Sequence, residues 1–256
     1  MTETSMPDVA ATAIASHRGG AQCWPENSRL AFRQSTALPV EFVEFDIHRS
    51  SDGVLVVHHD ATLGRTAEGE GAIADLAWDR LSQVRLIGTD GETIPTFAEV
   101  LDILGPSPLK LRIELKNRAD GSRYPGLEGE VVAALSARGL MDRTTFTSFD
   151  LETLVELARV APGRPLIFLV KESYFTTHGR DIRALARKAR AAGVGEIALR
   201  VSQMQDDDPA ICAEEGVRFG VFAAHDEAAI TRAFAAGVSA FTTDRPDLAI
   251  ALRPQA

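Results

Sequence analysis

The sequence predicts a closed (β/α)8 barrel, the TIM-barrel fold. Short apolar runs alternate with amphipathic segments along most of the chain, and many of the amphipathic segments end at a glycine. This alternation is typical of parallel strands joined by crossover helices, and eight such units fit a closed barrel. A doubly wound open sheet is the alternative, but it usually has fewer strands, and the chain lacks a Gly-x-Gly-x-x-Gly fingerprint. We therefore expect one barrel domain over residues 1–256.

The expected elements follow in order along the chain. The strands are expected at residues 9–16, 42–48, 109–116, 144–149, 166–170, 197–201, 218–223 and 240–243. The first helix should begin after Pro25-Glu26-Asn27-Ser28, whose polar side chains suit a helix start. The later helices are expected at 96–104, 126–138, 151–160, 180–192, 209–215, 227–236 and 246–252.

One region departs from the repeat. Residues 54–59 form an extra extended segment, joined to the second strand by a turn at Asp52-Gly53. Residues 61–95 contain several glycines and only a short helical pattern at 76–84. We interpret 61–95 as an insertion over the site, outside the barrel repeat.

The second strand carries a pair of acids on one face. Residues two apart in a strand point to the same side, so Glu44 and Asp46 share a face, while Val43, Phe45 and Ile47 take the other. Two carboxylates on one side of a buried strand repel each other and lose solvation, so a positive group is expected between them. A divalent metal would fit, and oxygen ligands favour Mg or Ca.

Further polar residues lie at the predicted carboxyl ends of the strands, where barrels of this kind place their active sites. His17 and Arg18 end the first strand, and His59 ends the 54–59 segment. Glu114 and Lys116 share a face of the third strand. The other strand ends contribute Ser148, Lys171, Glu172, Arg200, His225, Thr243 and Asp244.

Some of these polar residues have an ordinary structural interpretation. We interpret His48 and His58 as structural or as lying behind the site, and Arg112 as an ion-pair partner in the barrel interior. The sequence leaves open whether four residues after the fifth to seventh strands lie in the site or only at its rim: Lys171, Glu172, Arg200 and His225.

The candidate set matches the needs of phosphodiester hydrolysis. A metal held by Glu44, Asp46 and Glu114 would polarise a phosphoryl oxygen and hold a nucleophile. Nearby cations would take up charge on the equatorial oxygens. One of the histidines, His17 or His59, would remove a proton and the other would protonate the leaving oxygen, which suits an unperturbed pKa near ~6.5.

Composition limits the partners and the compartment. The formal net charge of −9 argues against a nucleic acid or an anionic membrane as partner. Cys23 and Cys212 lie far apart and form no disulfide framework, which favours a reducing compartment. The N-terminus has no signal-peptide pattern, and no apolar run approaches the ~18 residues of a membrane span. We expect a cytoplasmic protein without stable membrane insertion.

The sequence resembles the glycerophosphodiester phosphodiesterase family, and the resemblance spans nearly the whole chain. It is carried by His17-Arg18-Gly19, Pro25-Glu26-Asn27-Ser28, Glu44-Phe45-Asp46, Asp52-Gly53, Val56-Val57-His58-His59-Asp60, Leu63-Gly64-Arg65-Thr66, Ile94-Pro95-Thr96, Glu114-Leu115-Lys116, Ser148-Phe149 and Thr242-Thr243-Asp244-Arg245-Pro246. These motifs are specific in combination. The resemblance implies a TIM barrel with a short insertion after the second strand.

The resemblance also implies roles for individual residues and a reaction. The implied metal ligands are Glu44, Asp46 and Glu114, the acid–base pair is His17 and His59, the phosphate-holding residues are Arg18 and Lys116, and the supporting residue is Asn27. The family cleaves glycerophosphodiesters to sn-glycerol 3-phosphate and an alcohol, usually with Mg or Ca. A route consistent with this has the glycerol 2-hydroxyl attack phosphorus before water opens the cyclic phosphate, and the order in which the histidines act stays open.

The chain departs from the family pattern in two places. Ser28 stands where the family usually has Thr, and the hydroxyl is kept. Near the seventh strand, where the family often has Val-Trp followed by Asn, the chain reads Val221-Phe222-Ala223-Ala224-His225, which affects the expected glycerol pocket.

Two other functions remain as alternatives. A lysophospholipase D-like phosphodiesterase would use apolar residues of the 61–95 insertion as a lipid-facing surface. A non-enzymatic barrel could bind a phosphorylated ligand, although every expected acid–base residue and metal ligand is present. The alcohol released and the oligomeric state are not specified by the sequence.

Overall fold

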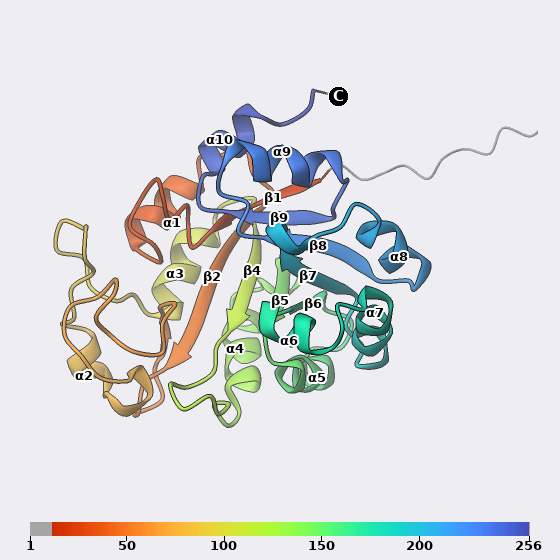
Figure 1. The fold of residues 1–256 in the computed structure, drawn as a ribbon. Coiled ribbons are helices and arrows are strands. Elements are labelled where there is room, and N and C mark those ends of the chain that lie inside the picture. The colour runs from red at the N-terminus through yellow and green to blue at the C-terminus, as the bar shows by residue number, and fades with distance from the viewer. Residues whose placement is uncertain (1–11, 256) are drawn as a thin grey trace, which may run out of the picture.

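Eight parallel strands form a closed barrel inside a ring of helices in the computed structural model, which describes residues 12–255 (Figure 1). The barrel strands are β1 (Ala13–His17), β2 (Phe42–Arg49), β4 (Lys110–Leu115), β5 (Thr144–Ser148), β6 (Leu166–Leu169), β7 (Glu196–Arg200), β8 (Arg218–Phe222) and β9 (Ala240–Thr243). Because β1 pairs with both β2 and β9, the sheet closes on itself. The predicted fold class is confirmed. The expected start of the first strand, at residues 9–11, lies outside the described residues.

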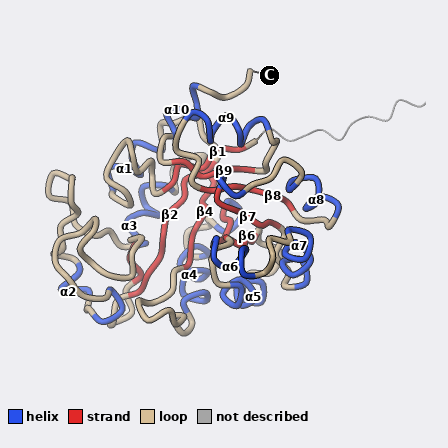
Figure 2. Tube along the Cα trace, in the orientation of Figure 1, coloured by secondary structure: helices blue, strands red, loops and turns tan. Residues whose placement is uncertain are grey.

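Helices connect successive barrel strands and surround them, as the blue and red tubes of Figure 2 show. They are α1 (Arg29–Ser35), α3 (Phe97–Leu104), α4 (Leu127–Ser136), α5 (Leu151–Val160), α6 (Glu172–Thr177), α7 (Ile182–Ala191), α8 (Asp208–Glu214), α9 (Glu227–Ala235) and α10 (Pro246–Ala251). Short 3-10 turns are η1 (Ile73–Asp75), η2 (Met141–Arg143) and η3 (Val201–Gln203).

Helix α6 is an element that the sequence analysis did not predict. Lys171 and Glu172 were placed at the end of the fifth strand, but β6 ends at Leu169 and Glu172 opens α6. The helix has six residues, of which only Phe175 is buried. So short a segment carries no repeated apolar spacing, and the periodicity that marks longer helices is absent.

Side-chain caps explain where two of the helices begin. The Ser28 hydroxyl accepts a hydrogen bond from the Ala31 amide at 3.0 Å, which fixes the start of α1. Thr96 and Glu99 form a reciprocal capping box at the start of α3. Gly19 has φ +80°, and a Cβ there would lie 2.7 Å from the Ala31 Cβ, so only glycine lets α1 pack this closely against the loop after β1.

The extra extended segment is β3 (Leu55–Val57), which forms an antiparallel hairpin with β2. The chain after it, which includes α2 (Trp78–Leu81), lies beside the barrel at the left of Figure 1. It packs around its own apolar cluster of Val56, Leu63, Ala67, Ile73, Leu81, Val84, Leu86 and Ile94. The short insertion after the second strand is confirmed.

The two faces of β2 have different surroundings. Val43, Phe45 and Ile47 are fully buried under the helices, and the Phe45 ring meets Phe32 of α1 and Phe97 of α3. Burying a side chain of this size contributes roughly 1.5–3 kcal/mol. The opposite face of β2 points to the barrel interior and holds the acids, so the outer packing fixes which residues enter the site. No helix of residues 12–255 has the length and apolar character to cross a membrane.

Candidate active site

Three carboxylates meet on the inner face of β2 and β4. Asp46 pairs in register with Glu114 on the neighbouring strand, and Glu44 precedes Asp46 by two residues. One carboxylate oxygen from each lies within 4.8 Å of the others, and all three side chains are buried. Burial, with the charge of Asp46 next to it, raises the pKa of Glu44 to about 7. Carboxylates crowded in this way favour a bound cation.

Cationic and amide groups surround Asp46. The Lys116 Nζ lies 3.0 Å from Asp46 Oδ1 and 2.5 Å from Glu114 Oε1. The Arg18 Nε lies 3.5 Å from Asp46 Oδ2, and the Asn27 amide donates to the same oxygen at 2.8 Å. Burial opposes ionisation of Asp46, but Lys116 and the other positive neighbours outweigh it and hold the pKa of Asp46 well below its usual range.

Two of these residues adopt an unusual backbone conformation. Arg18 has φ +53° and Asn27 has φ +55°, in the left-handed region that non-glycine residues seldom occupy. Such a conformation costs of order 1–3 kcal/mol and is often found where a side chain must reach a binding site. Here it accompanies the approach of both side chains to Asp46.

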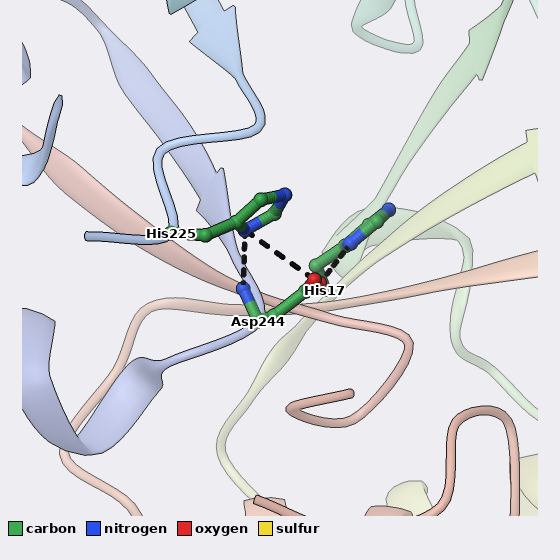
Figure 3. Close-up of side chains that lie close together, drawn as sticks. All are labelled: His17, His225 and Asp244. Atoms are coloured by element: carbon green, nitrogen blue, oxygen red, sulfur yellow. Dashed lines mark hydrogen bonds and ion pairs between the residues drawn. The ribbon is translucent and has the colours of Figure 1, made fainter. Parts of the chain in front are cut away.

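His17 is fixed in orientation by a carboxylate from the other end of the chain. Its Nδ1 lies 2.5 Å from Asp244 Oδ1 (Figure 3). Its Nε2 lies 3.9 Å from Glu44 Oε2. Burial alone would lower the pKa of His17, but the Asp244 hydrogen bond and the Glu44 charge outweigh it and raise that pKa. The His17 ring stacks against His225 at 5.8 Å, and His225 Nδ1 accepts a hydrogen bond from the Asp244 amide at 3.0 Å.

His59 is held in the same manner from the opposite side. Its Nδ1 lies 2.6 Å from Asp60 Oδ1, and Asp60 is bound in turn by the Arg65 guanidinium at 2.6 Å. The His48 Nε2 lies 3.2 Å from the His59 carbonyl oxygen, so this buried histidine supports the loop. Burial, with the nearby cations Lys116 and Arg18, lowers the pKa of His59 to about 4.

A cavity of about 300 Å³ opens between these groups at the carboxyl ends of the strands. It is lined by His17, Arg18, Glu44, His59, Arg112, Glu114, Thr147, Phe149, Leu169, Arg200, Phe222, Ala223, His225, Thr242 and Asp244. Most of this lining is polar or charged, and Phe149, Leu169, Phe222 and Ala223 form its apolar part. A small molecule with a phosphate at one end and an organic group at the other would match these two parts.

The structure brings together all the residues predicted for the site. The predicted catalytic, metal-binding and substrate-binding residues were His17, His59, Glu44, Asp46, Glu114, Arg18, Lys116 and Asn27. Each of them lines the cavity or contacts Asp46.

The sequence analysis did not assign a role to the two carboxylates that orient the histidines. Asp60 lies next to His59, so a local signal was present. Asp244 lies 227 residues from His17, and only closure of the barrel between β1 and β9 brings them together. Its position at the end of the last strand, within the motif 242–246, was the available signal.

The residues with an ordinary structural interpretation lie near the site but outside its centre. His48 is hydrogen-bonded to Tyr124, and His58 to the Asp60 carbonyl oxygen. Arg112 lies 3.6 Å from Glu196 in the barrel interior, as expected of an ion-pair partner, and also reaches the cavity floor. Of the residues left open, Arg200 and His225 line the cavity, and Lys171 lines the adjoining hollow.

Fold and cavity together define a TIM barrel with an enzyme-type pocket at the strand ends that such barrels use for catalysis. The sequence profile of the Glycerophosphoryl diester phosphodiesterase family matches residues 17–248. The chain belongs to this family.

Individual relatives agree with this assignment. A "Glycerophosphodiester phosphodiesterase" of Caldanaerobacter subterraneus subsp. tengcongensis is 31% identical over 59% of this chain, and the match spans 63% of that relative's length. A crystal structure of a "Putative glycerophosphoryl diester phosphodiesterase" from Agrobacterium tumefaciens str. C58 is 37% identical, with a TM-score of 0.91 over 95% of this chain and 97% of that one.

A more distant structure shares the fold. It is an Oleispira antarctica phosphodiesterase in complex with the product sn-glycerol-3-phosphate. It is 22% identical, with a TM-score of 0.76 over 94% of this chain and 96% of that one.

Proposed function

We propose that this chain hydrolyses glycerophosphodiesters to sn-glycerol 3-phosphate and an alcohol, with His17 and His59 as the proton carriers. One observation carries the proposal. Each histidine has its Nδ1 bound to a carboxylate, Asp244 or Asp60, so each presents Nε2 to the cavity on which the acidic cluster opens. Two oriented imidazoles beside an acidic cluster at one cavity suit the transfer of protons to and from a phosphodiester.

The donor set suits a divalent cation. Glu44, Asp46 and Glu114 offer hard oxygen ligands within 4.8 Å of one another. The buried Asn27 Oδ1 also has no hydrogen-bond partner among residues 12–255, so it is free for a cation. A cation held there would supply electrophilic stabilisation of the phosphoryl oxygens. We propose Mg or Ca for this role because all the ligands are oxygens.

The chain's own residues supply the remaining chemistry. Lys116 and Arg18 place positive charge beside the phosphate position and offset the negative charge that develops on its oxygens. One imidazole accepts the proton of the attacking glycerol 2-hydroxyl, and the other donates a proton to the leaving alcohol oxygen. Water then opens the resulting cyclic phosphate, with the proton transfers reversed, to give sn-glycerol 3-phosphate. The apolar part of the cavity, which includes Phe149 and Phe222, accommodates the alcohol group of the substrate.

The test is release of sn-glycerol 3-phosphate from glycerophosphocholine and glycerophosphoethanolamine by the purified chain. We expect release with added Mg or Ca and loss of release with EDTA. His17→Asn and His59→Asn should each lower kcat by about 10²–10⁴-fold. His178→Asn is the matched control, because that histidine contacts Tyr174 on α6 and does not line the cavity. Near-wild-type rates in both site variants would disprove the proposal.

Two further parts of the proposal concern the setting of the protein. We propose a cytoplasmic location, which the free thiols of Cys23 and Cys212 suit. We also propose a water-soluble diester as substrate, with the products passing to lipid and glycerol metabolism. A lysolipid substrate has less support, because Ile87 and Val155 are the only large apolar side chains exposed among the described residues.

A further inference from the structure

Two cations from neighbouring strands border the apolar part of the cavity, where Phe149 and Phe222 lie. Arg200 ends β7, and Lys171 follows β6 by two residues. Leu169 pairs with Ala198 across these strands, so the two cations occupy equivalent positions two residues beyond that pair. Residues two apart in an extended segment point to the same side. The side chain of Leu169 lines the cavity, so Lys171 and Arg200 are expected on that same inner side.

Both cations lie over aromatic rings of the cavity wall. The Lys171 Nζ lies 5.9 Å from the centre of the Phe149 ring, and the Arg200 Cζ lies 5.7 Å from the centre of the Phe222 ring. The two rings meet edge to face at 5.7 Å. The cations therefore border one continuous aromatic wall of the cavity.

Neither cation has an acidic partner within the part of the chain that the structure describes, since no ion pair there involves Lys171 or Arg200. Two acids that line the same hollows as these cations have other partners. Asp150 caps α5 and accepts a hydrogen bond from Asn117, and Asp244 is bound to His17. The chain as a whole has a net charge of −9, so two cations without an acidic partner among residues 12–255, beside the same cavity, make that part of the surface locally positive.

The position of the two cations favours a substrate whose alcohol carries an anionic group over one whose alcohol carries a cationic group. An aromatic pair could hold a quaternary ammonium through cation–π contacts. Here the rings of Phe149 and Phe222 already lie beneath the chain's own cations, so a cationic alcohol would meet like charge. An anionic group at the same place would be attracted by both Lys171 and Arg200.

We propose that the preferred substrates are glycerophosphodiesters whose alcohol carries a second anionic group, such as a phosphate monoester, and that Arg200 and Lys171 determine this preference. The proposal rests on the function proposed above. The diester phosphate lies between Arg18, Lys116 and the two histidines. The alcohol then extends along the aromatic wall, and its anionic group reaches the two cations.

The test compares kcat/KM for three substrates that release the same sn-glycerol 3-phosphate: glycerophosphoinositol 4-phosphate, glycerophosphoinositol and glycerophosphocholine. We expect the phosphate-bearing substrate to exceed its unphosphorylated counterpart by about tenfold, which corresponds to about 1.4 kcal/mol. The Arg200→Gln, Lys171→Gln double variant should bring that ratio close to one. Arg200→Lys keeps the charge and should keep most of the preference.

The matched control is Lys110→Gln. Lys110 also lies over a phenylalanine ring, Phe42, at 5.7 Å, but at the opposite end of the barrel. This variant should leave the substrate ratio unchanged. The wild-type ratio should also fall as salt is raised from about 0.01 to 1 M, because attraction between exposed charges is screened over that range.

The outcomes separate the two proposals. A wild-type ratio near one, a preference for the choline ester, or an unchanged ratio in the double variant would overturn the anionic-alcohol preference while glycerophosphodiester hydrolysis stands. No release from any of the three substrates with added metal would instead overturn the proposed function.

Discussion

Buried charges lie at both ends of the barrel interior, but they are balanced differently. At the amino-terminal ends of the strands, Glu196 lies 3.0 Å from Arg218 and 3.6 Å from Arg112, and it accepts a hydrogen bond from Ser239 at 2.9 Å. This single acid is surrounded by donors, so its charge is satisfied within the fold.

At the carboxyl-terminal ends, the acids outnumber the cations. Glu44, Asp46 and Glu114 share Lys116 and Arg18, and the pKa of Glu44 rises to about 7 because burial and Asp46 leave its charge poorly compensated. A surplus of buried charge is costly for folding, and it is expected where a ligand supplies the missing partner. The same residue types therefore stabilise the fold at one end and are proposed to bind a ligand at the other.

The largest expected effect comes from Asp46→Asn at the carboxyl-terminal end. Asp46 holds Lys116, Arg18 and Asn27 in place and belongs to the acidic cluster. We expect kcat/KM to fall by about 10³-fold, together with weaker binding of Mg or Ca by calorimetry. The free energy of unfolding should fall as well, because the lowered pKa of Asp46 means that its charge is stabilised by Lys116 and Arg18, so kcat/KM is compared per folded molecule. Retained activity, or a loss explained wholly by unfolding, would contradict a binding role for the acids at the carboxyl-terminal ends of the strands.

At the amino-terminal end, Glu196→Ala should affect stability instead. It leaves the buried Arg112 without its acid, and removing one partner of a buried pair costs about 3–5 kcal/mol. Urea denaturation measures the loss, and the activity of the folded fraction should persist. Glu214→Ala is the matched control: Glu214 pairs with Arg183 on the exposed surface, where such a change is usually within about ±0.5 kcal/mol.

Asp244→Asn tests whether the carboxylate orients His17. An amide in its place no longer fixes the proton on Nδ1, so we expect kcat to fall by about 100-fold with KM nearly unchanged. Asp244→Glu should restore part of the rate. A rise in KM with kcat unchanged would show instead that Asp244 acts on substrate binding.

The smallest expected effect is that of Gly220→Ala on β8. A Cβ there would lie 2.8 Å from Glu196 Oε1 and 3.0 Å from the Ala240 carbonyl oxygen, so the tight amino-terminal cluster must shift. Overpacking of this kind costs about 1–3 kcal/mol. Gly129→Ala on α4 is the control, since its Cβ would meet nothing within 4 Å and should be neutral or stabilising in a thermal melt.

The sequence was informative wherever the signal is local. Alternation along β2 and β4 placed Glu44, Asp46, Glu114 and Lys116 on one inner face, because a strand has a fixed period of two. The capping run before α1 and the glycines after later helices gave the order of elements. Local patterns of this kind depend on the chain's own geometry and need no tertiary contact.

Contacts made by barrel closure could not be read in the same way. The Asp244–His17 hydrogen bond depends on pairing between the first and last strands. The placement of Lys171 and Arg200 at one mouth depends on the register between β6 and β7. The short α6 was missed because six residues with one buried side chain leave no periodic pattern.

The β3 strand is shared between two separately packed parts of the molecule. Val57 belongs to the main barrel core, whereas its neighbour Val56 belongs to the cluster of the insertion. His59 lies two residues beyond the end of this strand, while His17 is carried by β1 of the barrel. The two histidines proposed to transfer protons are thus carried by two separately packed parts of the molecule. A local opening of the insertion would withdraw His59 while the acidic cluster stays in place, so changes in the insertion would be expected to alter turnover without rebuilding the proposed phosphate site.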